Sequence, residues 1–323
     1  MIKTRITEMF DIEYPIIQGG MLWLSRAELV AAVSNAGGLG ILSSATFLTR
    51  DEFHRELKRT RSLTSRPFGV NIPLFPALKP PDFEGYIQAM AEEGVRIVET
   101  AGRNPVEYMP LFQEHGMMVM HKVTAVRFAR KAQEMGCHAV VVDGFECAGH
   151  PGEEDVSSTV LLPAAVDALD IPVVAAGGFA NGRGLVAALA LGAEGVLMGT
   201  RFMMSGEAPM SPVLKEYLTG LKETDTMFVL RSLRNTARVI KNDVAYQVAA
   251  MEEKGATIAE LIPLVTGSRE KEVMDTGDIG RGLLHCGQAV GLIDDFPPVA
   301  EIIQNIMAEA EKTLNRLKGL TQA

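Results

Sequence analysis

The sequence predicts an α/β fold, a (β/α)8 TIM barrel with an appended helical region. Eight short apolar runs recur over residues 1–204, and each is followed by a polar turn and a segment with helical spacing. Runs such as Ala139–Val142 and Val173–Ala176 are apolar at every position, as parallel strands buried on both faces require. From about Ser205 onward helical patterns dominate. We therefore expect a barrel at 1–204 and a helical region at 205–323 whose last helix returns to the barrel. A doubly wound sheet is the main alternative.

The predicted strands are short apolar runs bounded by glycine, proline and polar residues. They lie at Pro15–Gln18, Leu39–Leu42, Phe68–Ile72, Arg96–Glu99, Met117–His121, Ala139–Val142, Pro172–Ala176 and Gly195–Met198. Helical spacing predicts the segments between them at Arg26–Asn35, Asp51–Arg61, Phe83–Glu93, Pro105–His115, Ala125–Met135, Val160–Leu169 and Gly182–Leu191. The first helix stops at a glycine pair, and the helix at 105–115 begins with a proline, which the first helical position favours.

Two further stretches have a predicted conformation. The prolines after the third strand predict a stiff loop that is neither helix nor central strand; they are Pro73, Pro76, Pro80 and Pro81. Beyond residue 205, helices are predicted at Ser211–Leu221, Ser232–Ile240, Val244–Lys254, Thr257–Val265 and Val299–Leu317.

The composition excludes several classes of protein. The chain has 323 residues, of which 47% are apolar and 22% charged, so it can bury a large core. Its net charge of −9 argues against binding nucleic acid or an anionic membrane surface. The cysteines are three in number and no CxxC occurs, so a reducing, cytoplasmic location is expected. No signal peptide is expected at the N-terminus, and no membrane insertion, because no run of 18 apolar residues occurs.

Glycine-rich turns follow the seventh and eighth strands. They read AAGGFANGRG and MGTRF, and the candidate binding residues are Gly177, Gly178, Gly199 and Thr200. Glycine lets backbone N–H groups approach phosphate oxygens, and barrels place phosphate sites after these two strands. Because both turns carry the signal, a phosphate site is favoured over plain tight turns.

Three other strand ends carry candidate binding residues. The turn Gly19-Gly20-Met21 after the first strand allows the backbone to approach a flat ring, although a plain turn fits equally well. Asn71 ends the third strand and Lys122 follows the fifth. Both fall at the carboxyl-terminal face, where barrel enzymes hold their active sites. Lys122 can neutralise an anion on a cofactor, while the alternative is a solvated lysine.

The turn Asp143–Glu153 after the sixth strand reads DGFECAGHPGE. His150 lies in a glycine-flanked part of this turn and can act as an acid or base near neutral pH. Asp143 and Glu146 could form a carboxylate pair, but Asp143 is expected to accept hydrogen bonds from a cofactor or from loop N–H groups. Cys147 has no adjacent base that would activate it. His121 is expected to point away from the site, and the remaining histidines are expected to be structural or solvated; these are His54, His115, His138 and His285.

Two segments of the helical region have weaker signals. A helix over RSLRNTARV would place Arg231, Arg234 and Arg238 on one face, which favours interdomain ion pairs over a grip on a dinucleotide phosphate. Gly287 and Gly291 are four residues apart, a spacing that suits close helix packing. No histidine and carboxylate spacing indicates a metal site.

Together, PIIQGGM, NAGGLG, FGVN, HK, DGFECAGHPGE, AAGGFANGRG, MGTRF and GQAVGLI resemble the nitronate monooxygenase (2-nitropropane dioxygenase) family of FMN-dependent barrels. DGFECAGHPGE, HKVTAVR and RSLRNTARV are most similar to its bacterial NADH:quinone reductase subgroup. The resemblance implies His150 as the active-site histidine and FMN contacts at Gly20, Met21, Leu22, Asn71, Lys122, Asp143, Ala148, Gly177, Gly178, Gly199 and Thr200. The loop Pro73–Pro81 resembles one lining the subgroup's substrate cleft, with Leu78 where a polar residue is expected.

The resemblance also implies the reaction. NAD(P)H would reduce the flavin and a quinone would reoxidise it, with small molecules as partners and a homodimer as the candidate assembly. The first alternative is oxidation of alkyl nitronates with O2, and enoyl-ACP reduction is a further one. Two hypotheses place the chain in other functional classes. One is a flavin-free barrel that acts on a phosphorylated metabolite, and the less favoured one is a non-catalytic binding protein.

Overall fold

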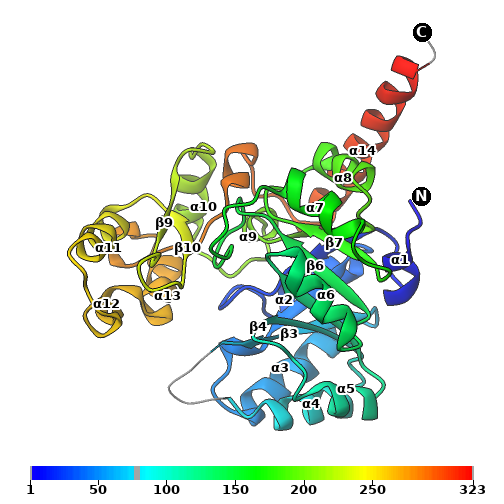
Figure 1. Cartoon of the computed structure of the whole chain (residues 1–323), viewed down its shortest axis with the longest axis horizontal. Helices are drawn as coiled ribbons and strands as arrows, with labels where there is room; N and C mark the ends of the chain where they lie inside the picture. The colour runs from blue at the N-terminus through cyan, green and yellow to red at the C-terminus, as the bar shows by residue number, and fades with distance from the viewer. Residues whose placement is uncertain (1, 76–80, 322–323) are drawn as a thin grey trace.

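Eight parallel strands close into a barrel in chain order (Figure 1), as the sequence predicts. This computed structural model describes residues 2–75 and 81–321. The barrel strands are β1 (Ile16–Gln18), β2 (Leu39–Ser43), β3 (Phe68–Leu74), β4 (Ile97–Gly102), β5 (Met118–Val123), β6 (Ala139–Asp143), β7 (Val173–Ala176) and β8 (Gly195–Met198). β1 pairs with both β2 and β8, which closes the barrel and excludes the doubly wound alternative.

Helices cover the outside of the barrel (Figure 1). They are α2 (Ala27–Asn35), α3 (Arg50–Leu63), α4 (Phe83–Glu92), α5 (Met109–Glu114), α6 (Val126–Glu134), α7 (Ser158–Val166) and α8 (Gly182–Ala190), with a 3-10 turn at Ser44–Thr46. Helix α5 begins four residues later than predicted. Pro110 has no N–H to donate to Val106, whose carbonyl instead accepts from Met109 in a tight turn.

Pro73 lies inside β3, where the sequence predicts a loop. The pairing of β3 with β2 ends at Asn71, whereas its pairing with β4 continues to Leu74. Residues 72–74 therefore form an edge, where the missing N–H of proline is tolerated. Residues 76–80 of the predicted proline loop, which include Pro76, Leu78 and Pro80, lie outside the described residues.

Helix α1 (Arg5–Phe10) closes the amino-terminal end of the barrel. Ile6 and Phe10 are buried against inward-facing strand residues such as Ile41 and Val141. Thr4, the helix N-cap, also donates to the carbonyl of Glu194 in the loop before β8. Because this end is filled with apolar side chains, the open mouth is at the carboxyl-terminal ends of the strands.

The long helix α14 (Val299–Thr321) packs between α8 and α2 and supplies apolar residues to the main core. Its Glu309 side chain accepts from the N–H of Gly182 at 2.8 Å. The last helix thus occupies the place of the eighth barrel helix, and the segment after the short helix α9 (Thr200–Met203) up to α14 extends from the barrel mouth (Figure 1).

This extension is not wholly helical. It contains α10 (Pro212–Thr219), β9 (Thr226–Val229), β10 (Ala237–Ile240), α11 (Asp243–Glu253), α12 (Ile258–Val265), α13 (Gly267–Thr276) and 3-10 turns at Ile279–Arg281 and Gln288–Leu292. The helix predicted at Ser232–Ile240 is wrong, because that stretch forms the turn and second strand of an antiparallel hairpin. All four residues of β10 are buried, including Arg238, and this burial depends on contacts with distant parts of the chain. Sequence reasoning also missed α13.

Gly287 and Gly291 do not lie on a packed helix face. Gly291 lies against the backbone at Glu223, and Gly287 lies against Glu146, Ala148 and Thr200 at the barrel mouth. Among residues 2–75 and 81–321, no helix is long and apolar enough to cross a membrane.

Candidate active site

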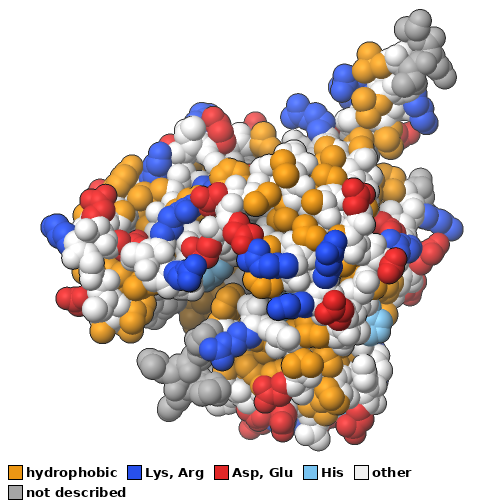
Figure 2. Space-filling model, in the orientation of Figure 1, with side chains coloured by type: hydrophobic (Ala, Val, Ile, Leu, Met, Phe, Trp, Pro, Cys, Tyr) orange, Lys and Arg blue, Asp and Glu red, His pale blue; other side chains and the backbone are white. Residues whose placement is uncertain are grey.

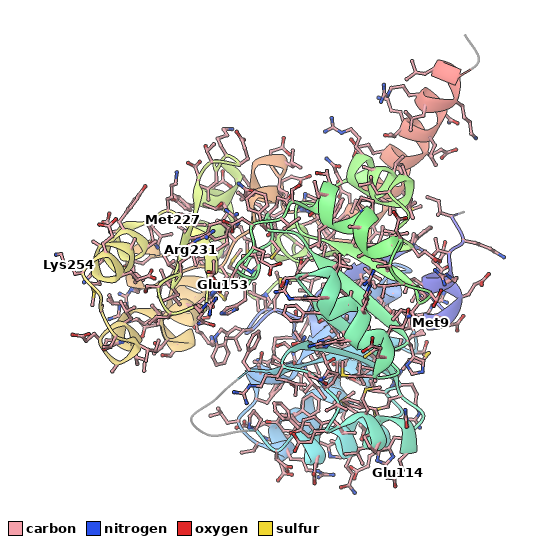
Figure 3. The ribbon with its side chains drawn as sticks, in the orientation of Figure 1. Met9, Glu114, Glu153, Met227, Arg231 and Lys254 are labelled. Carbon is pink, nitrogen blue, oxygen red and sulfur yellow. The ribbon has the colours of Figure 1, made fainter. Side chains whose placement is uncertain are left out.

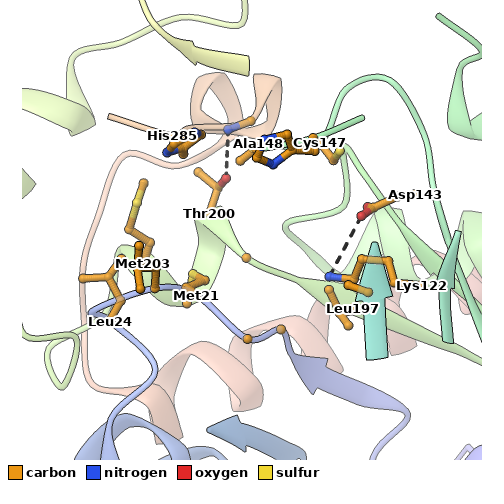
Figure 4. Close-up of a pocket in the computed structure, with 18 of the residues that line it drawn as sticks. Met21, Leu24, Lys122, Asp143, Cys147, Ala148, Leu197, Thr200, Met203 and His285 are labelled. Carbon is orange, nitrogen blue, oxygen red and sulfur yellow. Dashed lines mark hydrogen bonds and ion pairs between the residues drawn. The ribbon is translucent and has the colours of Figure 1, made fainter. Parts of the chain in front are cut away.

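A cavity of about 380 Å³ opens at the carboxyl-terminal mouth of the barrel, between the strand ends and the extension (Figure 4). All the candidate residues named from the sequence line it. They are Gly20, Met21, Leu22, Asn71, Lys122, Asp143, Ala148, His150, Gly177, Gly178, Gly199 and Thr200. The extension adds residues that sequence reasoning left out, chiefly Glu270 and His285.

The turns after β7 and β8 present backbone donors to this cavity. Gly177 and Gly178 have φ angles of +84° and +82°, which side-chain-bearing residues rarely adopt. A Cβ on Gly177 would also lie 2.8 Å from the carbonyl oxygen of Gly144. The N–H groups of Gly178 and Gly199 donate to no acceptor within the described part of the chain. The first N–H groups of α8 face elsewhere, because Glu309 and Asn181 accept from Gly182 and Gly184.

The turn after β1 is fixed against the strand ends. A Cβ on Gly20 would lie 2.4 Å from the Cβ of Asn71, so only glycine fits there. The hydroxyl of Ser25 accepts from the N–H of Met21 at 2.8 Å and from the amide of Gln18 at 2.8 Å. These bonds hold the backbone of the turn in one position beside the cavity.

A buried charge network forms one wall of the cavity. Asn71 donates to Glu99 Oε2 at 2.9 Å, and Lys122 Nζ lies 3.2 Å from Glu99 Oε1 and 3.9 Å from Asp143 Oδ2 (the latter drawn in Figure 4). Burial alone would lower the pKa of Lys122, but the charges of Glu99 and Asp143 outweigh burial and raise it. Lys122 is therefore a fixed cation. It is not the solvated lysine of the alternative reading.

Glu99 is a central residue of this wall, and sequence reasoning missed it. It is completely buried and pairs directly with Asn71 across β3 and β4. The available signal was a carboxylate inside an otherwise apolar strand, which in a parallel barrel has to find a partner.

Asp143 also lies against this network. Burial raises the pKa of Asp143 to about 6, although Lys122 acts in the opposite direction. The less favoured alternative, a carboxylate pair of Asp143 with Glu146, has no support in the hydrogen bonds of Glu146. Glu146 instead accepts from the N–H and the hydroxyl of Ser158, at 3.1 and 3.0 Å, and so anchors the start of α7.

Two histidines lie at the other side of the cavity. His150 stands at the mouth with its ring 5.1 Å from the ring of Phe75 and 6.2 Å from that of His285, measured between centres. The surrounding protein and the neighbouring His285 both lower the pKa of His150, so its imidazole is neutral at pH 7.

His285 was expected to be structural or solvated, and the structure corrects this. Its Nδ1 lies 2.8 Å from Oε1 of the buried Glu270, which also accepts from the His285 N–H at 3.0 Å. Burial would lower the pKa of His285, but the charge of Glu270 outweighs it and raises the pKa. No local motif marks His285. It reaches the cavity through a β-bridge to Val239, which lies in the hairpin strand that the sequence wrongly predicted as helix.

The other reactive side chains have structural surroundings. Burial, followed by the charge of Asp143, raises the pKa of Cys147, so this cysteine stays a thiol and is no nucleophile. His121 bonds Thr100 Oγ1 at 2.8 Å and does not line this cavity. Arg238 donates to the carbonyl of Phe145 and stacks on Phe228, which separates it from the exposed Arg231 and Arg234. Among the described residues, no group of three or more His, Cys, Asp and Glu side chains could hold a metal ion.

The closed barrel and this cavity at its carboxyl-terminal mouth, with buried charged side chains in its wall, define a TIM-barrel enzyme. The chain belongs to the nitronate monooxygenase family of oxidoreductases, whose family model matches residues 3–309.

Three known proteins show what this chain is similar to. A (3aS,4S,5R,7aS)-5-hydroxy-7a-methyl-1-oxo-octahydro-1H-indene-4-carboxyl-CoA dehydrogenase of Rhodococcus jostii (strain RHA1) is 34% identical over 99% of both chains. A probable nitronate monooxygenase of Staphylococcus saprophyticus is 30% identical over 98% of this chain and 99% of that one. The solved structure of FabK from Thermotoga maritima has a TM-score of 0.92 at 37% identity, covering 99% of this chain and 100% of its own.

Proposed function

We propose that this chain is an FMN-dependent NAD(P)H:quinone reductase. The residues present fit FMN. The free N–H groups of Gly178 and Gly199 are donors suited to its phosphate, since a phosphate needs acceptor-free N–H groups in a glycine turn. Between these turns and the Asn71–Glu99–Lys122 wall, the cavity offers a surface for a flat ring. FMN, when bound, supplies a ring that accepts and passes on two electrons.

The side chains of the wall have one electrostatic task. Lys122 stays protonated and is held in place by Glu99, so it presents a fixed positive charge to the cavity. A preorganised cation stabilises negative charge without having to reorient. Asn71 is fixed by the same carboxylate, and its position beside Gly20 limits how the turn after β1 can move.

The single observation that carries the choice of a reduction is the pairing of His285 with the buried Glu270 on the opposite wall. NAD(P)H, one proton and a quinone give NAD(P)⁺ and a hydroquinone, so the site has to supply a proton. Glu270 raises the pKa of His285 and so favours its protonated form, and the neutral His150 lies on the same side of the cavity. His285 holds that proton and His150 can bond the oxygen of the acceptor.

The test uses protein incubated with FMN and mixed with NADH without oxygen. Loss of the flavin absorbance, and its return on adding a quinone, are the expected results. His150→Asn should keep the flavin but lose about 10²- to 10⁴-fold in quinone turnover, the usual contribution of a positioned acid or base. His115→Asn, at the end of α5 and away from the cavity, is the matched control. Protein that binds no FMN, or wild-type turnover in His150→Asn, would overturn the proposal.

A second candidate is oxidation of alkyl nitronates with O2, which the family match favours. This reaction does not need the proton that His285 holds. Anaerobic mixing with propionate 3-nitronate separates the two functions: rapid loss of flavin absorbance with the nitronate, and none with NADH, would replace the quinone reductase assignment.

A further inference from the structure

We propose that a second cavity beside the reaction cavity binds the pyrophosphate of a nucleotide-bearing substrate. This inference rests on the proposed function, because it names the site that holds the distal half of NAD(P)H. The second cavity has a volume of about 510 Å³ and shares five lining residues with the first. The shared residues are Phe75, Ala101, Lys122, Asp143 and His150. One elongated molecule can therefore occupy both cavities.

Three cations from separate parts of the chain line the second cavity. Arg103 follows β4, Lys131 lies on α6, and Arg234 lies in the turn of the β9–β10 hairpin. Among the described residues, none of the three side chains has an ion-pair or hydrogen-bond partner. By contrast, the nearby Arg231 is paired with Asp155 at 2.6 Å, and Arg127 on α6 is paired with Glu154. In a chain with a net charge of −9, these three unpaired side chains give the cavity a local positive charge.

The carboxylates nearby do not cancel this charge. Apart from Asp143, which belongs to the Lys122 network, the described acidic residue of the lining is Glu153. It accepts from the N–H of Thr236 at 3.0 Å and from its hydroxyl at 2.5 Å. Figure 3 shows Glu153 near Arg231, where the extension meets the barrel. Glu153 thus ties the hairpin to the barrel and leaves the cations available to a ligand.

The backbone of the hairpin turn is held in an uncommon conformation. Arg234 has a φ angle of +51°, and Leu230 has one of +62°. Glu252 on α11 supports the turn by accepting from the N–H groups of Leu230 and Ser232. A left-handed backbone at a non-glycine residue persists only where the surroundings impose it. Here it fixes the point from which Arg234 reaches the cavity.

The chemistry of this lining matches phosphate groups. Arginine forks and lysine ammonium groups bind phosphate oxygens with charge-assisted hydrogen bonds. The neutral donors Asn104, Thr124 and Asn235 add hydrogen-bonding capacity. Lys and Arg side chains gather around the hollow beside the extension in Figure 2. A nucleotide pyrophosphate is the shared feature of NAD(P)H and of coenzyme A thioesters, and either would direct its reactive end past His150.

The experiment separates the tail from the reacting end. Arg103→Gln, Lys131→Gln and Arg234→Asn would each be loaded with FMN and compared using NADH and 1-benzyl-1,4-dihydronicotinamide, a hydride donor without phosphate. Each change should lower kcat/KM for NADH by roughly three- to tenfold, as expected for a partly exposed charge pair, and change that for the benzyl compound less than twofold. Arg130→Gln, exposed on α6 beside Lys131, is the control and should change neither. Equal loss with both donors, or no loss with either, would overturn the proposal.

A binding measurement keeps this test independent of the proposed function. Calorimetric titration of the FMN-loaded protein with ADP-ribose should give saturable binding that weakens by the same factor in the three variants. If NADH reduces no flavin but coenzyme A binds and the variants weaken it, the pyrophosphate site stands and its ligand is a thioester. If neither ADP-ribose nor coenzyme A binds, the site is refuted even where NADH turnover is observed.

Discussion

At the scale of single residues, the wall of the cavity depends on a carboxylate that touches no solvent. Glu99 lies 3.2 Å from Lys122 Nζ and accepts from Asn71. A buried charge is tolerated only where its partners stay in place, since removing one partner leaves the other uncompensated. The same interactions that fix the charge of Lys122 beside the cavity therefore also contribute to the stability of the fold.

This linkage predicts a non-additive pair of substitutions. Lys122→Met should lower the free energy of unfolding by about 3 kcal/mol, because it leaves Glu99 buried without its cation. The double variant Lys122→Met with Glu99→Gln removes the uncompensated charge and should recover a large part of that loss. Urea denaturation of the wild type, both single variants and the double variant measures the coupling. Effects that simply add would show that the two side chains are not energetically coupled.

The Glu270–His285 pair predicts a pH dependence. The pKa of His285 is raised from 6.5, so stability from this pair is fully present below pH 6.5 and is lost as pH rises through the raised pKa. The pKa of Glu270 is lowered from 4.5, so its contribution is present above pH 4.5 and is lost as pH falls through the lowered pKa. The contribution of the pair to stability is therefore greatest between pH 4.5 and pH 6.5.

The substitution Glu270→Gln tests whether Glu270 raises the pKa of His285. Without the carboxylate, burial alone acts on His285, so its pKa should fall below 6.5 and its imidazole should be neutral at pH 7. NMR titration of the His285 ring reports the shift directly. The alkaline loss of quinone turnover should move to lower pH in the same variant. Glu272→Gln, on the exposed face of the same helix, should leave both curves in place. An unchanged His285 titration in Glu270→Gln would contradict the assigned pairing.

At the scale of elements, the barrel could be predicted because its signals are local. Each strand is a short apolar run, and parallel strands bring their carboxyl-terminal ends to one face. Lys122 and His150 could therefore be placed at the same mouth from their positions after the fifth and sixth strands. The glycines after β7 and β8 were informative because a glycine at the end of a strand allows the backbone to come close to a neighbouring group.

The extension could not be predicted in the same way, because its structure depends on distant contacts. Residues 232–240 have helical spacing, yet Glu153 and Glu252 hold the turn and Val229 pairs with Ala237 in a buried hairpin. That error hid the position of His285, which a bridge from Val239 brings to the cavity. Glu99 was missed for a different reason. Its partner Lys122 lies on the next strand, and a single buried carboxylate has no spacing to recognise.

At the scale of the whole molecule, residues from both predicted units, 1–204 and 205–323, contribute to the main core of the barrel. Helix α14 belongs to the second unit by sequence but covers the barrel beside α8 and α2. We propose that residues 205–298 form the added unit and that α14 completes the barrel. The cavity then joins both units, since Lys122 and His150 come from the barrel and Glu270 and His285 from the addition.

The seam between α8 and α14 tests this arrangement. A Cβ on Gly182 would lie 2.3 Å from the carbonyl oxygen of Ile306 and 2.4 Å from the nitrogen of Ala310, so Gly182→Ala has to push the two helices apart. We expect the free energy of unfolding to fall by about 3 kcal/mol, the upper part of the range for overpacking. Gly319→Ala on α14 is the matched control, because a Cβ there meets nothing within 4 Å. Its higher helix propensity should leave stability unchanged or raised by up to about 1 kcal/mol. Urea denaturation followed by circular dichroism measures both. If α14 were only a loosely attached tail, Gly182→Ala would leave the main transition unchanged, and the assignment of α14 to the barrel would be wrong.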